Sequence, residues 1–219
     1  MARGAAGNFA APCFRTVTPA LRLVSLPALG PSLPRRGNAF TRALGRGVLR
    51  LLGWDVEGTL PDTPRFVLIG APHTSNWDGI VGLATALAIG LGVHVFAKQE
   101  LFRFPTGPLL RALGGVPIDR SAGSSVVERA VQTFSERERF VLAISPEGTR
   151  RKVDTWKTGF YRIALGAGVP VAAVAFDWDR KRIHGLGTVV PTGDLDADVA
   201  ALRALYVGIN GKHPALQTL

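Results

Sequence analysis

A histidine and an aspartate stand close together in one short polar stretch, where their side chains could activate a hydroxyl group. His73 and Asp78 are separated by four residues, Thr-Ser-Asn-Trp. A carboxylate that accepts a hydrogen bond from one imidazole nitrogen leaves the other free to take a proton, and it stabilises the resulting imidazolium. In a regular helix the two side chains would lie roughly 140° apart, so they can meet only if the chain curls back. In the alternative interpretation, Asp78 caps a helix and His73 is an ordinary polar loop residue.

Two further stretches place cations at candidate loops. Residues 145–152 contain Arg150, Arg151 and Lys152 beside Gly148, whose backbone can approach an anion closely. Residues 114–121 have the pattern of a strand and then reach Arg120 at a loop. A phosphate group would suit such sites, although either stretch on its own could simply be a solvated charged turn.

The pattern from residue 65 onward alternates short β-branched runs with longer helical segments. This alternation predicts an α/β fold with a mostly parallel central sheet flanked by helices. Strands are expected at 66–69, 93–97, 116–118, 140–144 and 169–176. Helices are expected at 79–91, 106–113, 124–138, 156–166 and 195–206. Open α/β sheets bind ligands at the carboxyl ends of their strands, so chemistry is expected in the polar loops that follow 66–69 and 140–144.

One uncharged run, residues 79–97, is a candidate for a membrane span. It contains His94 and several glycines, and the glycines at 90 and 92 divide it into a helix followed by a strand. A transmembrane helix needs roughly 20 consecutive apolar residues. The division therefore favours two elements of a globular domain over a span.

The positive charge is concentrated near the N-terminus. The chain has a net charge of +10, and residues 1–54 hold eight arginines and no acidic residue, which leaves only +2 for residues 55–219. Arginines interleaved with apolar residues predict contact with an anionic surface, either lipid or nucleic acid. Residues 1–34 are expected to form a poorly ordered basic leader, with a transit peptide or a misassigned start as alternatives.

Residues 38–52 predict a basic amphipathic helix within a membrane-contacting segment, 35–54. Its arginines recur at every fourth position, at Arg42, Arg46 and Arg50. An apolar set lies roughly 200° round the helix, and consists of Phe40, Leu44, Val48 and Leu52. Like charges at this spacing repel one another, so anionic headgroups would stabilise the helix. The alternative is a first helix that covers the core and keeps its arginines in solvent.

The composition excludes several classes of protein. With 219 residues, of which 47% are hydrophobic and 19% charged, the chain is a globular domain and not a disordered one. A single cysteine, Cys13, cannot form an internal disulfide, and four scattered histidines do not make a zinc motif, so no metal is predicted. A nucleic-acid-binding module would normally add a groove-reading helix or stacking aromatics, and neither is found.

In their order and spacing, these stretches resemble the motif blocks of the glycerolipid acyltransferase family, which includes the lysophosphatidic acid (1-acylglycerol-phosphate) acyltransferases. The matching blocks are the His-x4-Asp motif at 72–78, Gly115–Arg120, Ser145–Arg150 and Gly168–Val171. The resemblance extends over residues 35–206 and implies one acyltransferase domain at 35–219, with its catalytic core at 65–206.

The resemblance implies transfer of a fatty acyl group from acyl-CoA or acyl carrier protein to the free hydroxyl of an anionic lysolipid. Lysophosphatidic acid, giving phosphatidic acid, is the first choice of acceptor. His73, oriented by Asp78, would be the general base for direct attack on the thioester, with no acyl-enzyme, metal or other cofactor. By similarity, the residues that hold the acceptor's head group would be Arg120, Glu147, Gly148, Thr149 and Arg150.

Several positions depart from the family's usual residues and bear on the acceptor. They are Pro72, Ser145, Arg151 and Ala173. A lyso-aminolipid or another hydroxylated lipid is therefore the second choice, and a non-catalytic basic protein that binds membrane or nucleic acid is the competing class. The expected location is the cytoplasmic face of a membrane, as a peripheral or monotopic protein with membrane lipids as partners and no specific nucleic acid.

Overall fold

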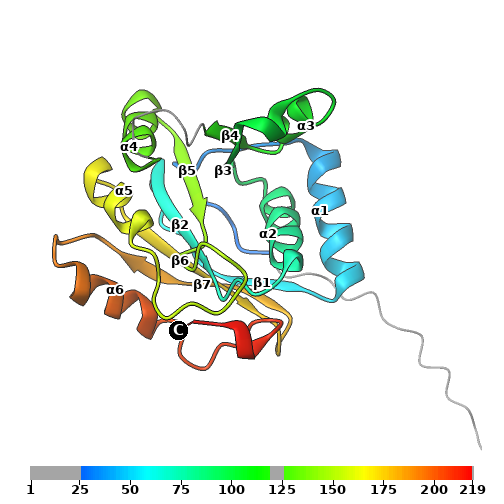
Figure 1. Ribbon diagram of the computed structural model, residues 1–219. Coiled ribbons are helices and arrows are strands. Elements are labelled where there is room, and N and C mark those ends of the chain that lie inside the picture. Colours follow the sequence, from blue (N-terminus) through cyan, green and yellow to red (C-terminus); the bar gives the residue numbers. More distant parts are fainter. Residues whose placement is uncertain (1–25, 119–125, 219) are drawn as a thin grey trace, which may run out of the picture.

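A seven-stranded sheet with helices on both faces forms the domain (Figure 1). The computed structural model describes residues 26–118 and 126–218. The helices are α1 (Ala39–Leu52), α2 (Asn76–Ile89), α3 (Thr106–Ala112), α4 (Val126–Glu136), α5 (Gly159–Ala167) and α6 (Leu195–Ala204). The strands are β1 (Asp55–Gly58), β2 (Arg65–Ala71), β3 (Val93–Lys98), β4 (Gly115–Ile118), β5 (Phe140–Ile144), β6 (Val171–Asp177) and β7 (Arg182–Val189). Two short 3-10 helices, η1 (Gln99–Phe102) and η2 (Pro214–Leu216), complete the described elements.

The strand order is β1-β7-β6-β2-β5-β3-β4, with every neighbouring pair parallel except β6 and β7. The predicted mostly parallel α/β sheet is therefore confirmed. Strand β2 lies between β5 and β6, so the carboxyl ends of these three strands meet at one edge. The loops after β2 and β5, which carry the motif residues, are brought together there.

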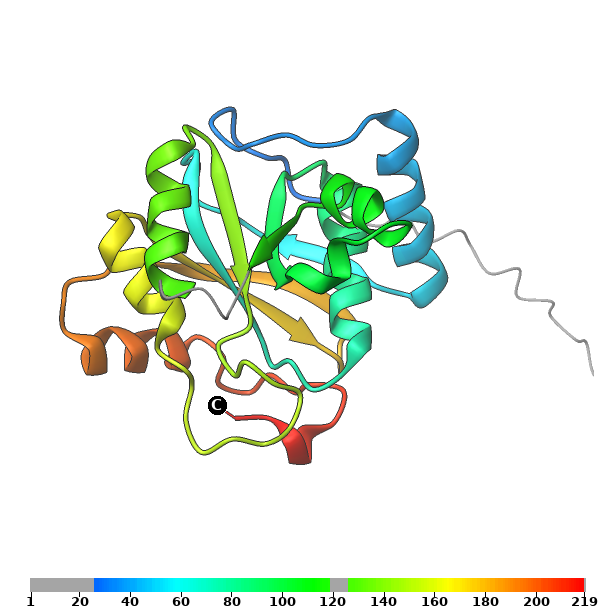
Figure 2. The same ribbon diagram turned by 45° about the horizontal axis from the view of Figure 1, so that its top comes forward.

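Strand β2 shows how the sheet divides the core. Side chains alternate between the two faces of a strand. Val67 and Ile69 pack with residues of α4, α5 and α6, whereas Phe66 packs on the opposite side with Leu33 and Leu91. Helices α1 and α2 cover that second side, as the views in Figures 1 and 2 show.

Helix α1 packs on α2 through its smallest residue. Asn38 caps α1 by accepting from the Thr41 N–H, and Gly53 ends the helix in a left-handed conformation. Gly45 lies so close to α2 that a Cβ atom there would be 2.5 Å from the Ala88 nitrogen. The packing face of α1 is thus Gly45 and Leu49, both buried.

The outward face of α1 is apolar. Phe40, Leu44 and Leu51 are 74%, 51% and 87% exposed. The predicted basic amphipathic helix is present, but its Phe40–Leu44 stripe points away from the core. The alternative in which the apolar side covers the core is therefore wrong for these two residues.

Two strands were not expected from the sequence. Strand β7 contains His184 and two glycines, which weaken the β pattern, and β1 has only four residues. Pairing with β6 gives β7 its strand, and β7 in turn pairs with β1 at the edge.

The remaining elements fall within a few residues of their predicted bounds, with two differences. Helix α2 begins at Asn76, three residues earlier than expected, because Ser75 caps it. The predicted leader 1–34 is too long: Leu33 is buried and the Gly92 N–H donates to the Pro34 carbonyl, so 26–34 belong to the domain. Residues 1–25 lie outside the described residues.

The run 79–97 folds as a helix followed by a strand, as expected. Helix α2 has 14 residues and ends at Gly90, where the chain turns into β3. Within the described parts of the chain, every helix is too short or too polar to cross a bilayer.

Candidate active site

The loop between β2 and α2 curls back and brings His73 onto Asp78. His73 Nδ1 lies 3.2 Å from Asp78 Oδ2, with the Asp78 side chain fully buried and that of His73 24% exposed. An ionised carboxylate only accepts hydrogen bonds, so Nδ1 carries the proton and Nε2 is left to accept one. The geometry is that of a histidine–aspartate dyad with a free basic nitrogen.

Asp78 takes part in capping α2, although it is not the N-cap residue that the alternative interpretation predicted. Ser75 is the N-cap of α2, and Asp78, three residues later, accepts from the Ser75 N–H at 2.8 Å to complete a capping box. The turn that starts the helix therefore also places the carboxylate under His73.

Asp78 also accepts a hydrogen bond from a residue that is distant in the sequence. The Trp178 indole N–H donates to Asp78 Oδ1 at 2.6 Å, 100 residues away in sequence. Trp178 directly follows β6, whose carboxyl end lies beside that of β2. Asp78 thus accepts hydrogen bonds from a backbone amide and an indole and lies 3.2 Å from the imidazole Nδ1, an arrangement that satisfies the buried carboxylate and fixes its orientation.

The side chain of Glu147 hydrogen-bonds to the main chain of His73. Its Oε2 accepts from the backbone N–H of His73 at 2.8 Å, and the residue is only 2% exposed. Burial is the main reason that the pKa of Glu147 is raised to about 7; the hydrogen bond and the charge of His73 oppose this rise, and the charge of Asp78 adds to it. The other carboxylate oxygen, Oε1, is buried with no hydrogen-bond partner among the described residues. Glu147 therefore contacts the histidine loop and points inward.

The rest of the cationic loop faces outward beside the dyad. Gly148 has a φ of +63°, and a Cβ atom there would be 2.8 Å from the side chain of Lys157. The Arg150 guanidinium donates to the side chain of Asn76 at the start of α2. The predicted residues Gly148 and Arg150 thus lie with the dyad at one edge of the sheet, together with Lys157, which had no assigned role.

The other two residues predicted for the acceptor site, Thr149 and Arg120, are not placed at the dyad by a described contact. Thr149 is half-buried, and its hydroxyl accepts from the Arg151 N–H at 3.3 Å within the same loop. Arg120 lies outside the described residues.

A segment near residue 211 packs against the dyad loop from outside. The His213 N–H donates to the Thr74 hydroxyl at 3.1 Å, and the Trp178 N–H donates to the Asn210 carbonyl. A Cβ atom on Gly211 would be 2.9 Å from the Thr74 hydroxyl, so only glycine allows this approach. The segment holds both the loop that carries His73 and the tryptophan that orients Asp78.

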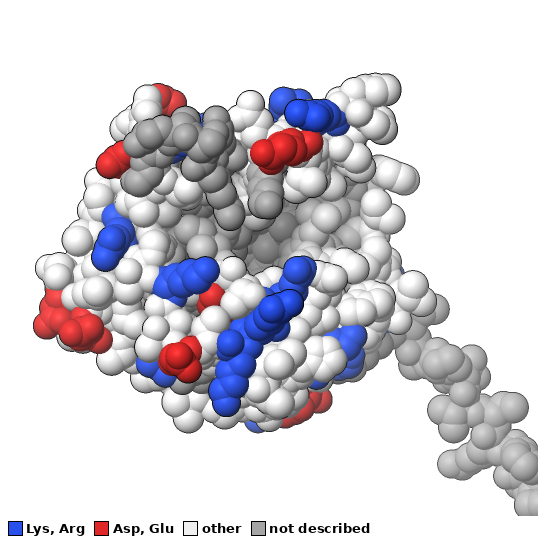
Figure 3. Space-filling model, in the orientation of Figure 1, with Lys and Arg blue, Asp and Glu red and all other residues white. Residues whose placement is uncertain are grey.

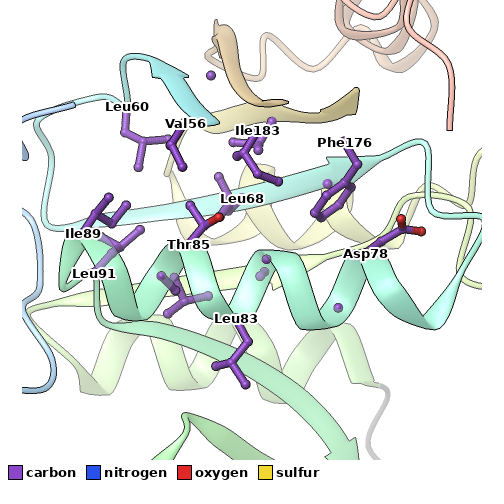
Figure 4. Close-up of a pocket in the computed structure, with 18 of the residues that line it drawn as sticks. Val56, Leu60, Leu68, Asp78, Leu83, Thr85, Ile89, Leu91, Phe176 and Ile183 are labelled. Atoms are coloured by element: carbon purple, nitrogen blue, oxygen red, sulfur yellow. The ribbon is translucent and has the colours of Figure 1, made fainter. Parts of the chain in front are cut away.

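An apolar cavity of about 370 Å³ lies between α2 and the sheet and reaches the dyad. Figure 4 shows Asp78 and Phe176 at one end, and Leu60, Ile89 and Leu91 at the opposite end. Two glycines, Gly70 and Gly82, leave room for the Phe176 ring, which is 2.8 Å from a Cβ atom built on Gly70. The cavity is suited to an extended hydrocarbon group whose polar end lies at His73.

The charged surface near the dyad is basic. Figure 3 shows a hollow in this face of the molecule, with Lys and Arg side chains along its lower rim. Lys212 stacks on two tryptophans, with its Nζ 5.1 Å from the ring centre of Trp77 and 4.9 Å from that of Trp178. In the part of the chain that the structure describes, no three His, Cys, Asp or Glu side chains group as metal ligands would.

Three contributors to the site were missed from the sequence. Trp178, Phe176 and Lys157 lie in or next to strands and loops whose neighbours are set by the sheet order, which the sequence does not state. The signal that could have found Trp178 and Phe176 is their position at the carboxyl end of a predicted strand.

Comparisons with known proteins find a matching family model and similar solved structures. A family model described as acyltransferase matches residues 55–177, which is more than half of the chain. The crystal structure of the 1-acyl-sn-glycerophosphate (LPA) acyltransferase PlsC from Thermotoga maritima is similar with a TM-score of 0.55 and 22% identity, covering 76% of this chain and 77% of that chain. No curated protein matches the sequence. The residues that the family model matches include His73, Asp78 and Glu147.

Proposed function

The chain belongs to the acyltransferase family and is an O-acyltransferase, and from this premise we propose that it transfers a fatty acyl group to the free hydroxyl of a lysophospholipid. The donor is a thioester, acyl-CoA or acyl carrier protein. Lysophosphatidic acid is the first choice of acceptor, with phosphatidic acid as the product. The observation that carries the proposal is the His73–Asp78 pair at one end of an apolar cavity of about 370 Å³.

In this mechanism His73 Nε2 takes the proton of the acceptor hydroxyl as that oxygen attacks the thioester carbonyl. The carbon–oxygen bond forms, the carbon–sulfur bond breaks, and the imidazolium returns its proton to the departing thiolate. Asp78 stabilises the imidazolium through the 3.2 Å contact to Nδ1. General-base catalysis of this kind contributes roughly 10²- to 10⁴-fold. No cofactor enters the proposal.

The size of the cavity supports a fatty acyl chain as the transferred group. Asp78 and Ile89 mark its two ends along α2, and eleven helical steps of 1.5 Å give a depth of about 16 Å. One leaflet of a bilayer core is about 15 Å thick, half of the roughly 30 Å total. The acyl chain of an ordinary membrane lipid therefore fits with its carbonyl carbon at the dyad.

The outward-facing cations support an anionic acceptor. Gly148, Arg150 and Lys157 lie together beside the dyad, and we assign the acceptor's phosphate to them, with Arg120 and Thr149 as further candidates. Glu147 contacts the main chain of His73 and points inward, so we assign it to positioning the loop. A lyso-aminolipid with an acidic head group is the second candidate, because the same cations would hold it.

The outward apolar stripe of α1 supports action at a membrane surface. Phe40, Leu44 and Leu51 are exposed on one face of α1, and Arg42, Arg46 and Arg50 belong to the same helix but lie on other sides of it. An exposed apolar face on a helix that also carries arginines fits the boundary between acyl chains and anionic headgroups. We assign the enzyme to the cytoplasmic face of a membrane as a peripheral or monotopic protein.

The test is acyl transfer from labelled acyl-CoA, and separately from acyl carrier protein, to a panel of lysolipids that includes lysophosphatidic acid. The wild-type protein is expected to form a labelled diacyl product, and the acceptor that gives the highest kcat/KM identifies the substrate. The variants His73→Ala and Asp78→Asn are expected to lower kcat by roughly 10²-fold or more, because each removes part of the general base.

A matched control is His213→Ala. This histidine is exposed and contacts the dyad loop through its main chain only, which alanine retains. Full activity in His73→Ala would refute the dyad mechanism alone, whereas wild-type protein that acylates no lysolipid from either donor would refute the proposed function.

A further inference from the structure

A second cluster of cations lies at the opposite edge of the sheet from His73. Arg36, His94, Arg111 and Arg137 line an open cavity of about 310 Å³, together with the main chain at the start of β4. His94 stands at the beginning of β3, and Arg137 lies between α4 and β5. These are the amino ends of the parallel strands, so the cavity is separate from the dyad and its cationic loop.

Two of the guanidinium groups converge on one imidazole. Arg36 Nη2 is 2.8 Å from His94 Nε2, and Arg137 Nη1 is 3.4 Å from the same atom. A guanidinium can only donate, so His94 Nε2 is an acceptor and the ring is neutral. Burial, followed by the charges of Arg36 and Arg137, lowers the pKa of His94 to about 4. The histidine therefore links two cations without adding a third charge.

Among the described residues, 26–118 and 126–218, the cations Arg36, Arg111 and Arg137 of this cluster have no carboxylate paired with them. Burial and the nearby charge of Arg137 lower the pKa of Arg36, which shows that the two cations repel each other. A bound anion would remove this repulsion.

The guanidinium groups of Arg111 and Arg137 each lie over an aromatic ring. The Arg111 guanidinium lies 5.3 Å from the centre of the Phe102 ring, and that of Arg137 lies 5.1 Å from the centre of the Phe140 ring. Arg36 is fixed by its hydrogen bond to the Val93 carbonyl. Three positioned guanidinium groups facing one cavity are the donor set that binds phosphate through charge-assisted, paired hydrogen bonds.

We propose that Arg36, Arg111 and Arg137, bridged by His94, form a binding site for a phosphate group away from the dyad; Arg36 also lines the apolar cavity, so the two cavities adjoin there. The cavity is open and larger than a phosphate ion, so the group can belong to a soluble phosphate compound or to the headgroup of a lipid. Apolar side chains suited to a membrane surface lie near it: Arg36 precedes α1, and Arg111 lies in the last turn of α3, where Leu109 is 62% exposed and the preceding Phe104 is 91% exposed. Helices α1 and α3 lie side by side in both Figures 1 and 2.

The experiment titrates the full-length protein with inorganic phosphate and follows the ring signals of His94 by NMR, assigned with a His94→Asn variant. The signals are expected to shift and saturate. The double variant Arg111→Gln, Arg137→Gln should bind phosphate at least roughly tenfold more weakly, because two charge-assisted donors are lost. Both side chains are exposed, so circular dichroism should show an unchanged fold.

Two controls separate this site from other basic surfaces. Arg139→Gln removes an exposed arginine two residues from Arg137 that does not line the cavity, and Arg150→Gln removes a cation at the dyad. Neither should change the shift of His94. A wild-type protein whose His94 does not respond to phosphate, or a double variant that responds with equal affinity, would overturn the site.

A second arm distinguishes the source of the phosphate. Phosphatidylcholine vesicles with and without phosphatidic acid are added to the wild type and to the double variant. Binding that needs both phosphatidic acid and the two arginines, and that displaces free phosphate from His94, assigns the site to a lipid headgroup. Phosphate binding that such vesicles leave unchanged assigns it to a soluble compound, and a His94 that responds to neither source contradicts the proposal.

Discussion

At the scale of single residues, the buried carboxylate of Asp78 connects three parts of the chain. It accepts hydrogen bonds from the Ser75 main chain and the Trp178 indole, and it lies 3.2 Å from Nδ1 of the His73 ring. An ionised carboxylate buried in this way is stable only because each of its contacts is a donor. The same contacts fix the direction of the His73 ring, so helix capping and the proposed catalysis use one side chain.

Glu147 makes the stability of the enzyme depend on pH. Its pKa rises from 4.5 to about 7, mainly because it is buried. Between these values the unfolded chain has released the proton while the folded chain keeps it, so the free energy of unfolding falls as pH rises through this window. Above about 7 the loss is complete and is on the order of 3 kcal/mol.

The variant Glu147→Gln should lose this dependence, because an amide does not ionise. The measurement is the free energy of unfolding in urea for both proteins from pH 4.5 to about 7. The wild-type value is expected to fall relative to that of the variant across the window. Two parallel curves would show that Glu147 does not titrate there.

Residue identities were predicted well where the motif is contiguous and poorly where contacts are long-range. His73 and Asp78 were identified because a stretch of six residues contains both, and the structure places their side chains 3.2 Å apart. Trp178 was not identified from the sequence, because its contact with Asp78 spans 100 residues. Lys157 was not assigned to the site for a similar reason, since only the folded loop brings its side chain against Gly148.

At the scale of elements, the contact between α1 and α2 depends on the absence of a side chain. A Cβ atom at Gly45 would lie 2.5 and 2.6 Å from main-chain atoms of α2, which cannot move independently of the helix. Gly45→Ala should therefore separate the helices and destabilise the protein by roughly 1–3 kcal/mol.

Gly47 provides the matched control on the same helix. A Cβ atom there meets nothing within 4 Å, so Gly47→Ala should stabilise the protein by roughly 0.5–1 kcal/mol through helix propensity alone. Urea midpoints of the two variants measure both effects. Equal or greater stability of Gly45→Ala would contradict the close contact.

The outward stripe of α1 can be tested in the same element. Changing Phe40, Leu44 and Leu51 to serine should weaken binding to phosphatidylglycerol vesicles at least tenfold, since burying each such side chain contributes roughly 1.5–3 kcal/mol. Val207→Ser removes a side chain that is 80% exposed outside this stripe and should have no effect. Co-sedimentation with vesicles measures the difference, and unchanged binding of the triple variant would exclude the stripe as the contact.

Sequence periodicity indicates which faces a helix has but not which face the fold covers. The arginines and the apolar set of α1 were both predicted, whereas Gly45 and Leu49, between them, form the face that packs. Strand β7 was missed because its glycines interrupt the β pattern, and a partner strand compensates for that weakness. Long periodic helices such as α4 and α6 were predicted because their own residues determine them.

At the scale of the whole molecule, the cavity exists because α2 stands off from the sheet instead of packing on it fully. Thr85 lies on α2 between the two ends of the cavity. Thr85→Phe should block the distal half, so that a palmitoyl donor is disfavoured relative to an octanoyl donor by more than tenfold. Each methylene left in water costs about 0.8 kcal/mol.

The kcat/KM ratio for octanoyl-CoA and palmitoyl-CoA measures this shift. Thr133→Phe is the control, because Thr133 also donates to a main-chain carbonyl of its helix but lies outside the cavity. A ratio that stays the same in Thr85→Phe would show that the acyl chain binds elsewhere. The cavity itself was beyond sequence analysis, because it depends on the distance between two layers.

The contact between His213 and Thr74 also bears on how the enzyme is made. These residues are 139 positions apart. While a ribosome is still adding the residues between them, the emerging chain already contains His73 and Asp78 but lacks the segment that supports their loop. A polypeptide released before residue 210 would contain every motif of the family and still lack the contacts that hold Thr74 and Trp178. The dyad therefore acquires this support only after residues 210–213 have been made and have emerged from the ribosome.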